Sequence, residues 1–572
     1  MQRLLASDGH IAPLTVERVL LCTLLVIIFV VLLEAGLHQL THLCKRHHKY
    51  YEMLTKTTGE LMIVGLIYLL VKCVTYFGII QAYGVEYYSM DAADMLIFFV
   101  AIFLVAQSLV IFTRLRTANK KHDALSITSA AGLVHMAKDT EDVLAAQRAW
   151  WCTRRVSNSR IRDLCEHKLL EAFFHDVYDL PHAFSFAKYL REIQDSLIAD
   201  LIEIDVTTWG LLLVLMAAFF GATGELQAGS VYRNSFPPES EEFAEALALE
   251  ANRPVVLGVF ATALTFAMSG MLFYLKKLNH GLVKLAQRAA LGHSDPESYK
   301  QPKSDAVLDA VRALSLAESL RPPIAPKDAI EQMRRVSNEM LRGERRRKGL
   351  FRNNLLVQMV QSFGRKCTKN ASAKSNTLHA KVANLSLPLP FSRKAAQFFV
   401  QFFLIVNGLY YGMLVTCVVP SLHGERMALV SVLLVPLLVN TVVLAPRLVR
   451  DFALLDGTWR VDAHKLSRVI DHLNEVEELK DAMVHQVHLH LDAHGQTVDN
   501  IRAELAQSDL DDGVRDGYVD IDAFRDTLTR FGFKLSRHKF HTLVLLEYQT
   551  QGTTVKYDDL FKTLAQTSTD AA

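Results

Sequence analysis

The sequence lacks the patterns that mark common enzyme classes and disulfide-rich proteins. Its seven cysteines include no CxxC pair, and none falls in a segment expected outside the cell, so neither a zinc site nor a disulfide framework is indicated. It has no phosphate-binding glycine loop, HExxH motif or nucleophile elbow, and we predict that the protein is not an enzyme. The net charge is only +2, and we expect no nucleic-acid partner.

Apolar residues, by contrast, are abundant and gathered in blocks. Val19–Leu33 is an unbroken apolar run, and a second run begins after Glu60 and continues past Lys72. Each is close to the ~20 residues that a helix needs to cross about 30 Å of hydrocarbon. Glu34 and Glu60 stand at the ends of these runs and are expected to anchor them at the inner face. The N-terminus has no cleavable signal pattern, so the first span is expected to direct insertion itself.

Five further apolar runs predict an all-α, polytopic membrane protein with seven transmembrane helices and a helical, EF-hand-like cytoplasmic domain. The predicted spans cover about residues 19–38, 60–83, 94–113, 206–224, 254–275, 395–419 and 427–446. The fourth span is the weakest, because it is short and flanked by glycine.

The distribution of Lys and Arg near the span ends predicts the orientation. Basic residues follow the first, third and fifth spans, whereas the segments 84–93 and 224–253 are acidic. We therefore predict that residues 1–18 lie outside and the C-terminus inside. The large loops 114–205 and 276–394 are then cytoplasmic, and the first contains an amphipathic helix over Phe184–Ile204. A juxtamembrane helical linker is expected at 448–490, before the tail at 491–572.

Five short motifs or single residues follow one another along the membrane region in an order that can be compared with known membrane proteins. They are Leu33-Glu34-Ala35-Gly36-Leu37-His38 at the first-span exit, Glu60-Leu61-Met62 at the second-span start, Phe184–Leu190 before span four, Asn407 in span six and Pro446 at the end of span seven. This order resembles that of the MLO family of seven-span plant and algal membrane proteins. The family's topology, with the N-terminus outside, agrees with the orientation predicted from charge.

The resemblance implies a calmodulin-regulated protein of the plasma membrane. Such a protein would act as a calcium-permeable channel or as a regulator of calcium-linked secretion and defence. The chain departs from the family in lacking paired outer-loop cysteines, in its shorter first outer loop and in its longer second cytoplasmic loop. We therefore expect a divergent member.

Polar residues within the spans are candidate functional groups. Lys72 lies near the middle of span two, where a charge is costly and usually faces the bundle interior or water. It is interpreted as a pore or gating residue, or as half of a structural pair with a carboxylate, or as a snorkelling side chain. Pro436 removes the hydrogen bond to the carbonyl of Val432 and is predicted to kink its helix. Asn440, one turn on, is expected to satisfy the freed groups or to face Asn407.

The tail contains two segments that resemble EF-hand units. In the first, Gly517 fits the sharp turn and Val519 the short β contact between paired loops. The twelfth loop position is Ala523, so the bidentate carboxylate is missing, and an expanded loop is the alternative. The candidate calcium ligands are Asp509, Asp511, Asp512, Asp516, Asp520 and Asp522.

The second unit is expected to have its loop at Tyr548–Asp559, with Val555 at the β contact. Tyr548 stands at the first ligand position, where it is a poor calcium ligand. The other interpretation of both units is a scaffold for packing or partner binding.

Two basic amphipathic segments are candidate targets for calmodulin or for the tail. They are Gly343–Lys366 and Phe452–Leu473. Their apolar anchors include Leu350, Val357, Phe363, Trp459 and Leu466. The alternative for both is a helix that lies on the anionic lipids of the inner leaflet.

The leading hypothesis is an MLO-like channel or channel regulator in calcium-linked signalling. The alternative is a non-conducting seven-span scaffold or receptor that recruits cytoplasmic partners. The sequence leaves oligomerisation open for both.

Overall fold

A computed structural model describes most of the chain. The described residues are 20, 24–25, 27–28, 31–32, 35–41, 48–80, 85–125, 130–146, 151–181, 184–202, 206–226, 249–291, 306–320, 326–345, 391–422, 428–459, 461–511, 517–535, 540, 543–544, 548, 550–551, 554–561 and 564.

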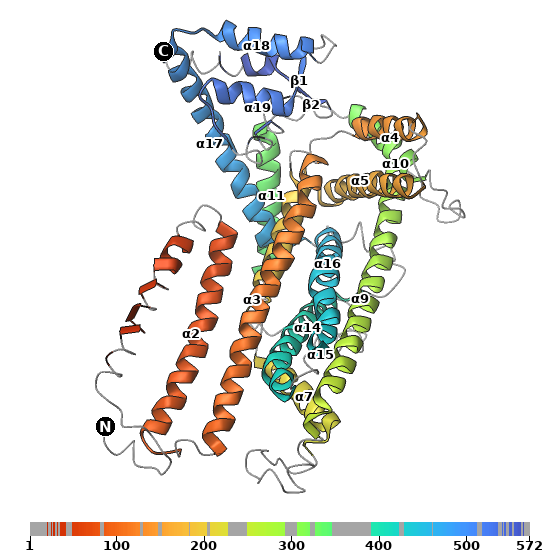
Figure 1. The fold of residues 1–572 in the computed structure, drawn as a ribbon. Helices are drawn as coiled ribbons and strands as arrows, with labels where there is room; N and C mark the ends of the chain where they lie inside the picture. Colours follow the sequence, from red (N-terminus) through yellow and green to blue (C-terminus); the bar gives the residue numbers. More distant parts are fainter. Residues whose placement is uncertain are drawn as a thin grey trace. The chain divides into compact units, whose positions relative to one another are not determined.

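The chain forms two compact units. The first, here called the membrane unit, comprises Met1–Thr113, Asp195–Met271 and Phe398–Leu448, and the second unit comprises Arg114–Gln194, Leu272–Gln397 and Val449–Ala572. The helices (Figure 1) are α2 (His48–Tyr76), α3 (Val85–Leu125), α4 (Ala130–Ala146), α5 (Trp151–Tyr178), α6 (Phe186–Ala199), α7 (Val206–Thr223), α9 (Arg253–Ala290), α10 (Ala306–Leu320), α11 (Pro326–Arg345), α14 (Arg393–Met413), α15 (Ala428–Val439), α16 (Ala445–Trp459), α17 (Ala463–His494), α18 (Val498–Asp511) and α19 (Ile521–Arg530). Two π-helical turns, η4 (Leu414–Val418) and η7 (Asn440–Leu444), and a 3-10 turn, η5 (Val419–Ser421), interrupt the helices of the last two predicted spans.

The all-α class and the presence of membrane-length helices are confirmed. Among the described residues, five helices are long and apolar enough to cross a membrane: Tyr51–Tyr76, Tyr87–Asn119, Arg253–Ala290, Arg393–Val418 and Ala428–Trp459. Several large apolar side chains of the membrane unit face outward, such as Phe266 at 79% and Val255 at 68% exposure. An aqueous surface would not tolerate so much exposed hydrocarbon, so lipid is the solvent of these helices.

The fourth predicted span forms the shorter apolar helix Thr208–Thr223. The first predicted span, 19–38, falls largely outside the described residues, and those that are described there are helical.

Three predicted boundaries differ from the structure. The second span was expected at 60–83, but α2 begins at His48 and ends at Tyr76, where Gly78 turns the chain with φ of +71°. The predicted amphipathic helix Phe184–Ile204 is shorter, because α6 covers Phe186–Ala199. The juxtamembrane linker 448–490 is helical, as expected, but a helix boundary falls within it, because α16 ends at Trp459 and Asp462 caps the start of α17.

Two glycines bring α3 and α14 into close contact in the membrane unit. A Cβ atom on Gly408 would lie 2.6 Å from Leu104 Cδ2, and one on Gly412 would lie 2.8 Å from Val100 Cγ2. The residue numbers rise along α14 as they fall along α3, so the two helices are antiparallel. Small residues four positions apart let membrane helices approach closely, and this approach places the polar side chains described below in contact.

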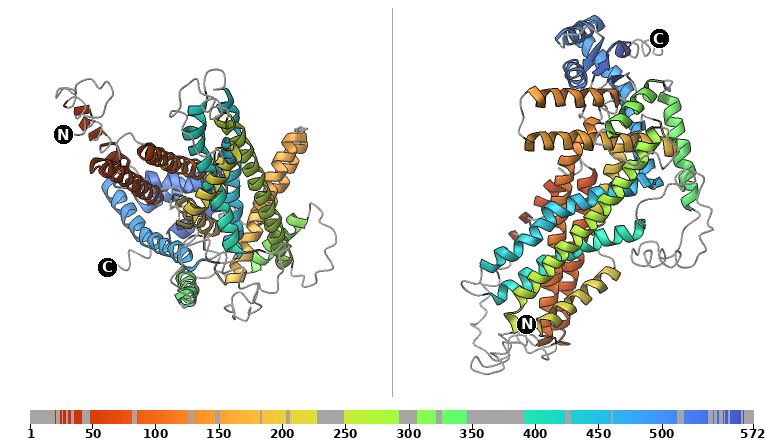
Figure 2. Two further views of the ribbon diagram at one scale, coloured as in Figure 1. Left: turned by 90° about the horizontal axis from the view of Figure 1, so that it is seen from below. Right: turned by 90° about the vertical axis from the view of Figure 1, so that its right-hand side faces the viewer.

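The second unit has a helical core and a small tail domain. Helices α4, α5 and α10 pack together, and α11 packs along α17 (Figure 2). Phe174 of α5 lies among the aromatic rings of Phe184, in the α5–α6 connection, and of Phe186 and Tyr189 in α6. These rings are fully or almost fully buried, and each contributes a large apolar area to the core.

The tail domain contains a small antiparallel sheet with strand order β1-β3-β2. The strands are β1 (Tyr518–Asp520), β2 (Thr550–Gln551) and β3 (Thr554–Lys556). Val519 pairs with Val555, which is the β contact expected from the two loop assignments. Both valines are fully buried.

Candidate functional site

A buried polar network lies between α3, α14 and η7 in the membrane unit. Asn407 Nδ2 donates to Gln107 Oε1 and to Thr441 Oγ1, both at 2.9 Å, and Asn407 Oδ1 accepts from Asn440 Nδ2 at 3.1 Å. Gln107 also donates to the carbonyl of Leu404. Asn407 and Asn440 are 0% exposed. The sequence-based expectation that Asn440 faces Asn407 is therefore confirmed.

The backbone around Pro436 explains how Asn440 and Thr441 reach this network. Pro436 lies inside α15, where it has no N–H to donate, and the π-helical turn η7 begins at Asn440, four residues later. A π turn adds a residue to the helix and rotates the side chains that follow, and such turns are frequent at functional sites. Thr441 Oγ1 donates back to the carbonyl of Leu437, which leaves its oxygen as the acceptor for Asn407.

Besides Asp94 Oδ1 of α3, three residues of these helices have buried side-chain polar atoms without a hydrogen-bond partner among the described residues. They are Ser108 Oγ, both amide atoms of Gln401, and Asn440 Oδ1. Ser108 is 0% and Gln401 4% exposed. Buried polar groups of proteins nearly always have a partner, so each of these three needs an explanation.

Lys72 contacts aromatic side chains rather than a carboxylate. Its ammonium donates to the hydroxyl of Tyr87 and lies 4.9 Å from the ring centre of Tyr87 and 5.2 Å from that of Tyr68. A cation over an aromatic face is stabilised by the ring quadrupole. One structural role considered for Lys72 was an ion pair with a carboxylate. Its described contacts are with tyrosines instead.

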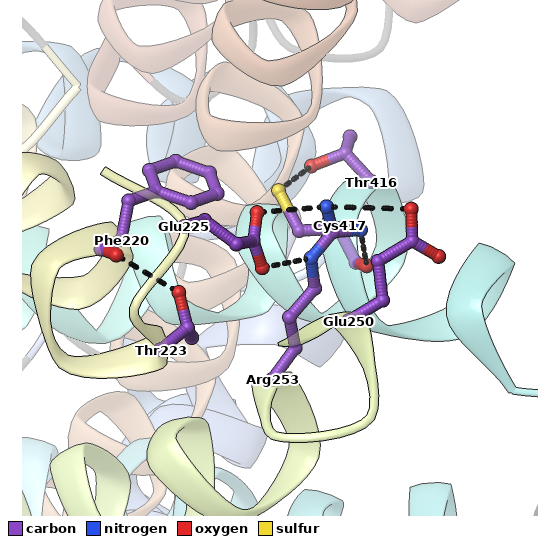
Figure 3. Close-up of polar contacts among 7 residues, drawn as sticks. All are labelled: Phe220, Thr223, Glu225, Glu250, Arg253, Thr416 and Cys417. Atoms are coloured by element: carbon purple, nitrogen blue, oxygen red, sulfur yellow. Dashed lines mark hydrogen bonds and ion pairs between the residues drawn. The ribbon is translucent and has the colours of Figure 1, made fainter. Parts of the chain in front are cut away.

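An ion-pair cluster joins the α7–α9 connection to η4 (Figure 3). The guanidinium of Arg253 forms two hydrogen bonds with the carboxylate of Glu225, at 2.8 and 2.9 Å, and lies 3.9 Å from Glu250. It also donates to the carbonyl of Cys417 at 3.2 Å. We call Arg253, Glu225, Glu250 and Cys417 the Arg253 clamp.

In the second unit, a polar junction holds the break between α16 and α17. Tyr178 Oη donates to the carbonyl of Trp459 at 3.0 Å, and the backbone N–H of Asp462 donates to Tyr189 Oη at 3.0 Å. Burial raises the pKa of Tyr189 well above its usual value, so its hydroxyl stays neutral. Arg393 pairs with Asp456 and lies 3.9 Å from Asp462. We call these residues, with Gly457, the α16–α17 junction.

The proposed partner-binding anchors fall in different places. Leu466 is fully buried next to the α16–α17 junction, and Trp459 is half-buried. The predicted continuous helix Phe452–Leu473 is wrong, because the Asp462 cap interrupts it. Leu350, Val357 and Phe363 lie outside the described residues, which on this side end with α11 at Arg345.

The candidate calcium ligands in the described part of the tail make contacts within the fold. Asp509 is 1% exposed and its Oδ2 accepts from Gly517 N at 3.2 Å and from Tyr557 Oη at 3.3 Å, while Oδ1 has no described partner. Asp520 caps α19, and Asp522 lies 3.6 Å from Arg525. No cluster of three metal-ligating side chains occurs among the described residues. Asp512, Asp516 and the side chain of Asp511 are outside the described set.

The two expected topology anchors also differ in their placement. Glu60 lies half-buried within α2, well after its start at His48, rather than at a helix end. Glu34 is not among the described residues.

A buried ion pair stabilises the α4–α5–α10 group. Lys168 Nζ lies 3.1 Å from Glu171 Oε2, and Glu318 accepts from the N–H of Ala130 at the start of α4. Burial raises the pKa of Glu171 although Lys168 acts in the opposite direction. Burial also raises the pKa of the nearby Cys165 thiol to about 11, so this thiol is protonated at neutral pH.

Sequence reasoning missed several residues of these sites. Gln107 and Thr441 are single polar residues in apolar runs, and nothing in the sequence assigns them partners. The spacing of Gly408 and Gly412 was a usable signal, because small residues four apart mark close helix contacts. The Arg253–Glu225 pair spans a long connection, and only the fold brings the two together.

Comparisons with known proteins provide no further guide to these sites. No family model, curated protein or solved structure matches the chain.

Proposed function

We propose that the chain is an MLO-like, multi-pass membrane protein that acts in calcium-linked signalling. In this proposal it is a calcium-permeable channel or a regulator of one, and calmodulin or its own EF-hand-like tail controls it. It has seven spans in the plasma membrane, with its N-terminus outside and its C-terminus in the cytoplasm. The observation that carries the proposal is the pairing of Val519 with Val555 in a chain whose described residues include five membrane-length helices.

The tail geometry supports an EF-hand-like pair. Each β residue follows a loop and precedes a helix turn, and the valine pair couples the two loops, as in paired calcium-binding units. Gly517 adopts φ of +82°, a conformation that favours glycine. Asp509 bonds the amide of this glycine across the loop. This contact favours the expanded loop, which starts at Asp509, over a loop of standard length.

Asp509 gives the tail a specific means of responding to calcium. Its Oδ1 is buried and has no hydrogen-bond partner among the described residues, and calcium binds carboxylate oxygens at about 2.3–2.6 Å. A bound ion would compete with the hydrogen bonds from Gly517 and Tyr557 for this carboxylate. Calcium binding would then change the position of β1, which pairs directly with the second loop.

The membrane unit supports a transport role through its buried polar groups. Asn407, Gln107, Asn440 and Thr441 form a polar centre among apolar helices, at a π turn and a helix-interior proline. Polar groups at this depth are costly and usually functional. The network contains no carboxylate among its described members, so a calcium ion passing here would retain much of its water shell.

A calcium-flux experiment tests the proposal. Purified full-length protein is reconstituted into vesicles that contain a calcium-sensitive dye, and flux is compared with that of Asn407→Leu and Lys72→Ala variants. We expect flux in the wild type, a reduced rate in Asn407→Leu, and modulation by calcium on the side of the tail. Asp509→Asn should abolish the modulation and leave basal flux unchanged.

The alternative function is a non-conducting scaffold or receptor that recruits cytoplasmic partners. The observation that favours it is the satisfied core of the polar network, whose central residue Asn407 has all its hydrogen-bonding groups paired. Absence of flux from vesicles that contain folded protein, combined with calcium binding by the full chain, would support this alternative and overturn the channel proposal.

A further inference from the structure

Two residues with unpartnered polar atoms, Ser108 of α3 and Gln401 of α14, lie on helices that pack closely against each other. Gly408 meets Leu104 and Gly412 meets Val100, so each position on α14 faces a position on α3 in antiparallel register. This register places Leu404 opposite Ser108, in agreement with the hydrogen bond from Gln107 to the Leu404 carbonyl. Gln401 is one helical turn, about 5 Å, from Leu404.

The buried faces of the two helices include these groups. Ser108 is 0% and Gln401 4% exposed, although neither has a hydrogen-bond partner among the described residues. The same is true of Asn440 Oδ1, whose amide nitrogen donates to Asn407. The unpartnered atoms thus continue from the Asn407 network toward the Arg393 end of α14.

An unmade hydrogen bond in this environment is expensive. A buried group without a partner loses the hydrogen bonds that water would give it, and a hydrocarbon surrounding offers no replacement. The amide of Gln401 needs both a donor and an acceptor, and the hydroxyl of Ser108 needs at least one partner. Water supplies both functions from one molecule, and buried waters typically make about three hydrogen bonds to such groups.

We propose that the α3–α14 interface is a binding site for internal water, held by Ser108, Gln401 and Asn440. These waters extend the Asn407 network into a polar seam from Gln401 to Tyr411. Ten residues of α-helix correspond to about 15 Å, which is half of the ~30 Å hydrocarbon thickness. This seam is also the route of the transported ion, an assignment that rests on the proposed function.

The lining of the seam defines the ligand chemistry. Its described side chains are amides and hydroxyls: Gln107, Ser108, Gln401, Asn407, Asn440, Thr441 and Tyr411. Such groups bind water and hydrated cations, whereas a fully dehydrated calcium ion takes about six to eight oxygen ligands, usually with carboxylates among them.

Radiolytic hydroxyl labelling of full-length protein in lipid nanodiscs tests the water site directly, because radicals form at bound waters and label the side chains beside them. Leu404, which is 0% exposed, is the reporter, and Leu257 of α9, also 0% exposed, is the dry reference. We expect labelling of Leu404 well above that of Leu257. In the Gln401→Met, Ser108→Ala double variant, Leu404 labelling should fall to the Leu257 level.

Equal labelling of Leu404 and Leu257 in the wild type would overturn the water site, and this measurement needs no variant to fold. Loss of Leu404 labelling in Thr262→Val, whose hydroxyl bonds only its own helix, would overturn the assignment to Gln401 and Ser108. Labelling without vesicle flux would reject the channel proposal and retain the water site. Vesicle flux without labelling of Leu404 would reject the water site and retain the channel proposal.

Discussion

Replacing Asn407 by leucine removes the centre of the buried polar network and keeps the branched shape and the number of heavy atoms of the side chain. Asn407 makes three side-chain hydrogen bonds, to Gln107, Thr441 and Asn440. Measured membrane hydrogen bonds average about 0.6 kcal/mol, so three of them give a lower estimate of about 2 kcal/mol. The loss can instead be counted by the groups that the variant leaves without partners, Gln107 Oε1 and Asn440 Nδ2. At about 1–3 kcal/mol each, they give an upper estimate of about 6 kcal/mol.

The free energy of unfolding is measured by titrating a denaturing detergent into mixed micelles, for Asn407→Leu, Asn440→Leu and the double variant. The cycle should show a coupling energy of about 0.6 kcal/mol and at most about 1.7 kcal/mol between the two asparagines. Thr262→Val is the matched control, because its hydroxyl is exposed and bonds only within α9, and we expect a change within about 0.5 kcal/mol. A loss in Asn407→Leu no larger than in this control would refute the reasoning.

Three further substitutions test other contacts through thermal or detergent unfolding. Gly457→Val should destabilise the second unit by about 1–3 kcal/mol through overpacking, since a Cβ atom there already lies 2.8 Å from Ile193 Cδ1; an unchanged midpoint would contradict this packing. Arg253→Lys should cost about 1–3 kcal/mol because lysine cannot make the paired bonds and also reach the Cys417 carbonyl; full stability would show that the Arg253 clamp is not rigid. Lys168→Met should cost about 3–5 kcal/mol at pH 8 by leaving buried Glu171 unpaired. The loss should be smaller at pH 5, because burial raises the Glu171 pKa, and a group with a raised folded-state pKa loses stability as pH rises through it; a pH-independent loss would reject this cause.

Hydrophobic pattern predicted the class of fold and most of its membrane helices. Runs such as Met95–Phe112 and Pro254–Leu275 are continuous and lie in helices of membrane length, because a spanning helix must satisfy its backbone internally. The pattern could not locate the helix ends that depend on tertiary packing. The start of α2 at His48 includes polar residues that a hydropathy window excludes.

The candidate site was predictable only where local chemistry dictates geometry. Pro436 indicated a disturbed helix, and Asn440 one turn later was expected to face Asn407, which the structure confirms. Gln107 and the Arg253 clamp depend on contacts across long sequence separations, and no local signal specifies them. The tail showed the same contrast, since Val519 and Val555 were identified by loop spacing but the Asp509–Gly517 bond was not.

Burial also separates the two candidate targets for calmodulin or the tail. In the segment Phe452–Leu473, Phe452 and Leu466 are fully buried, and Val469 and Ile470 are 2% exposed. Exposing these four side chains costs about 2 kcal/mol each, or roughly 8 kcal/mol together.

A partner that binds the exposed helix with Kd of 1 μM provides about 8 kcal/mol, so the net free energy of binding to the closed α16–α17 junction is near zero. Of the segment Gly343–Lys366, the structure describes only the residues up to Arg345, so this cost applies to the segment Phe452–Leu473 alone. Binding to the full chain should therefore be lost when Leu350 and Phe363 are replaced by alanine and retained when Leu466 is. Binding that depends instead on Leu466 would mean that the junction opens, and its affinity should then increase when Tyr189→Phe removes the acceptor for the Asp462 N–H.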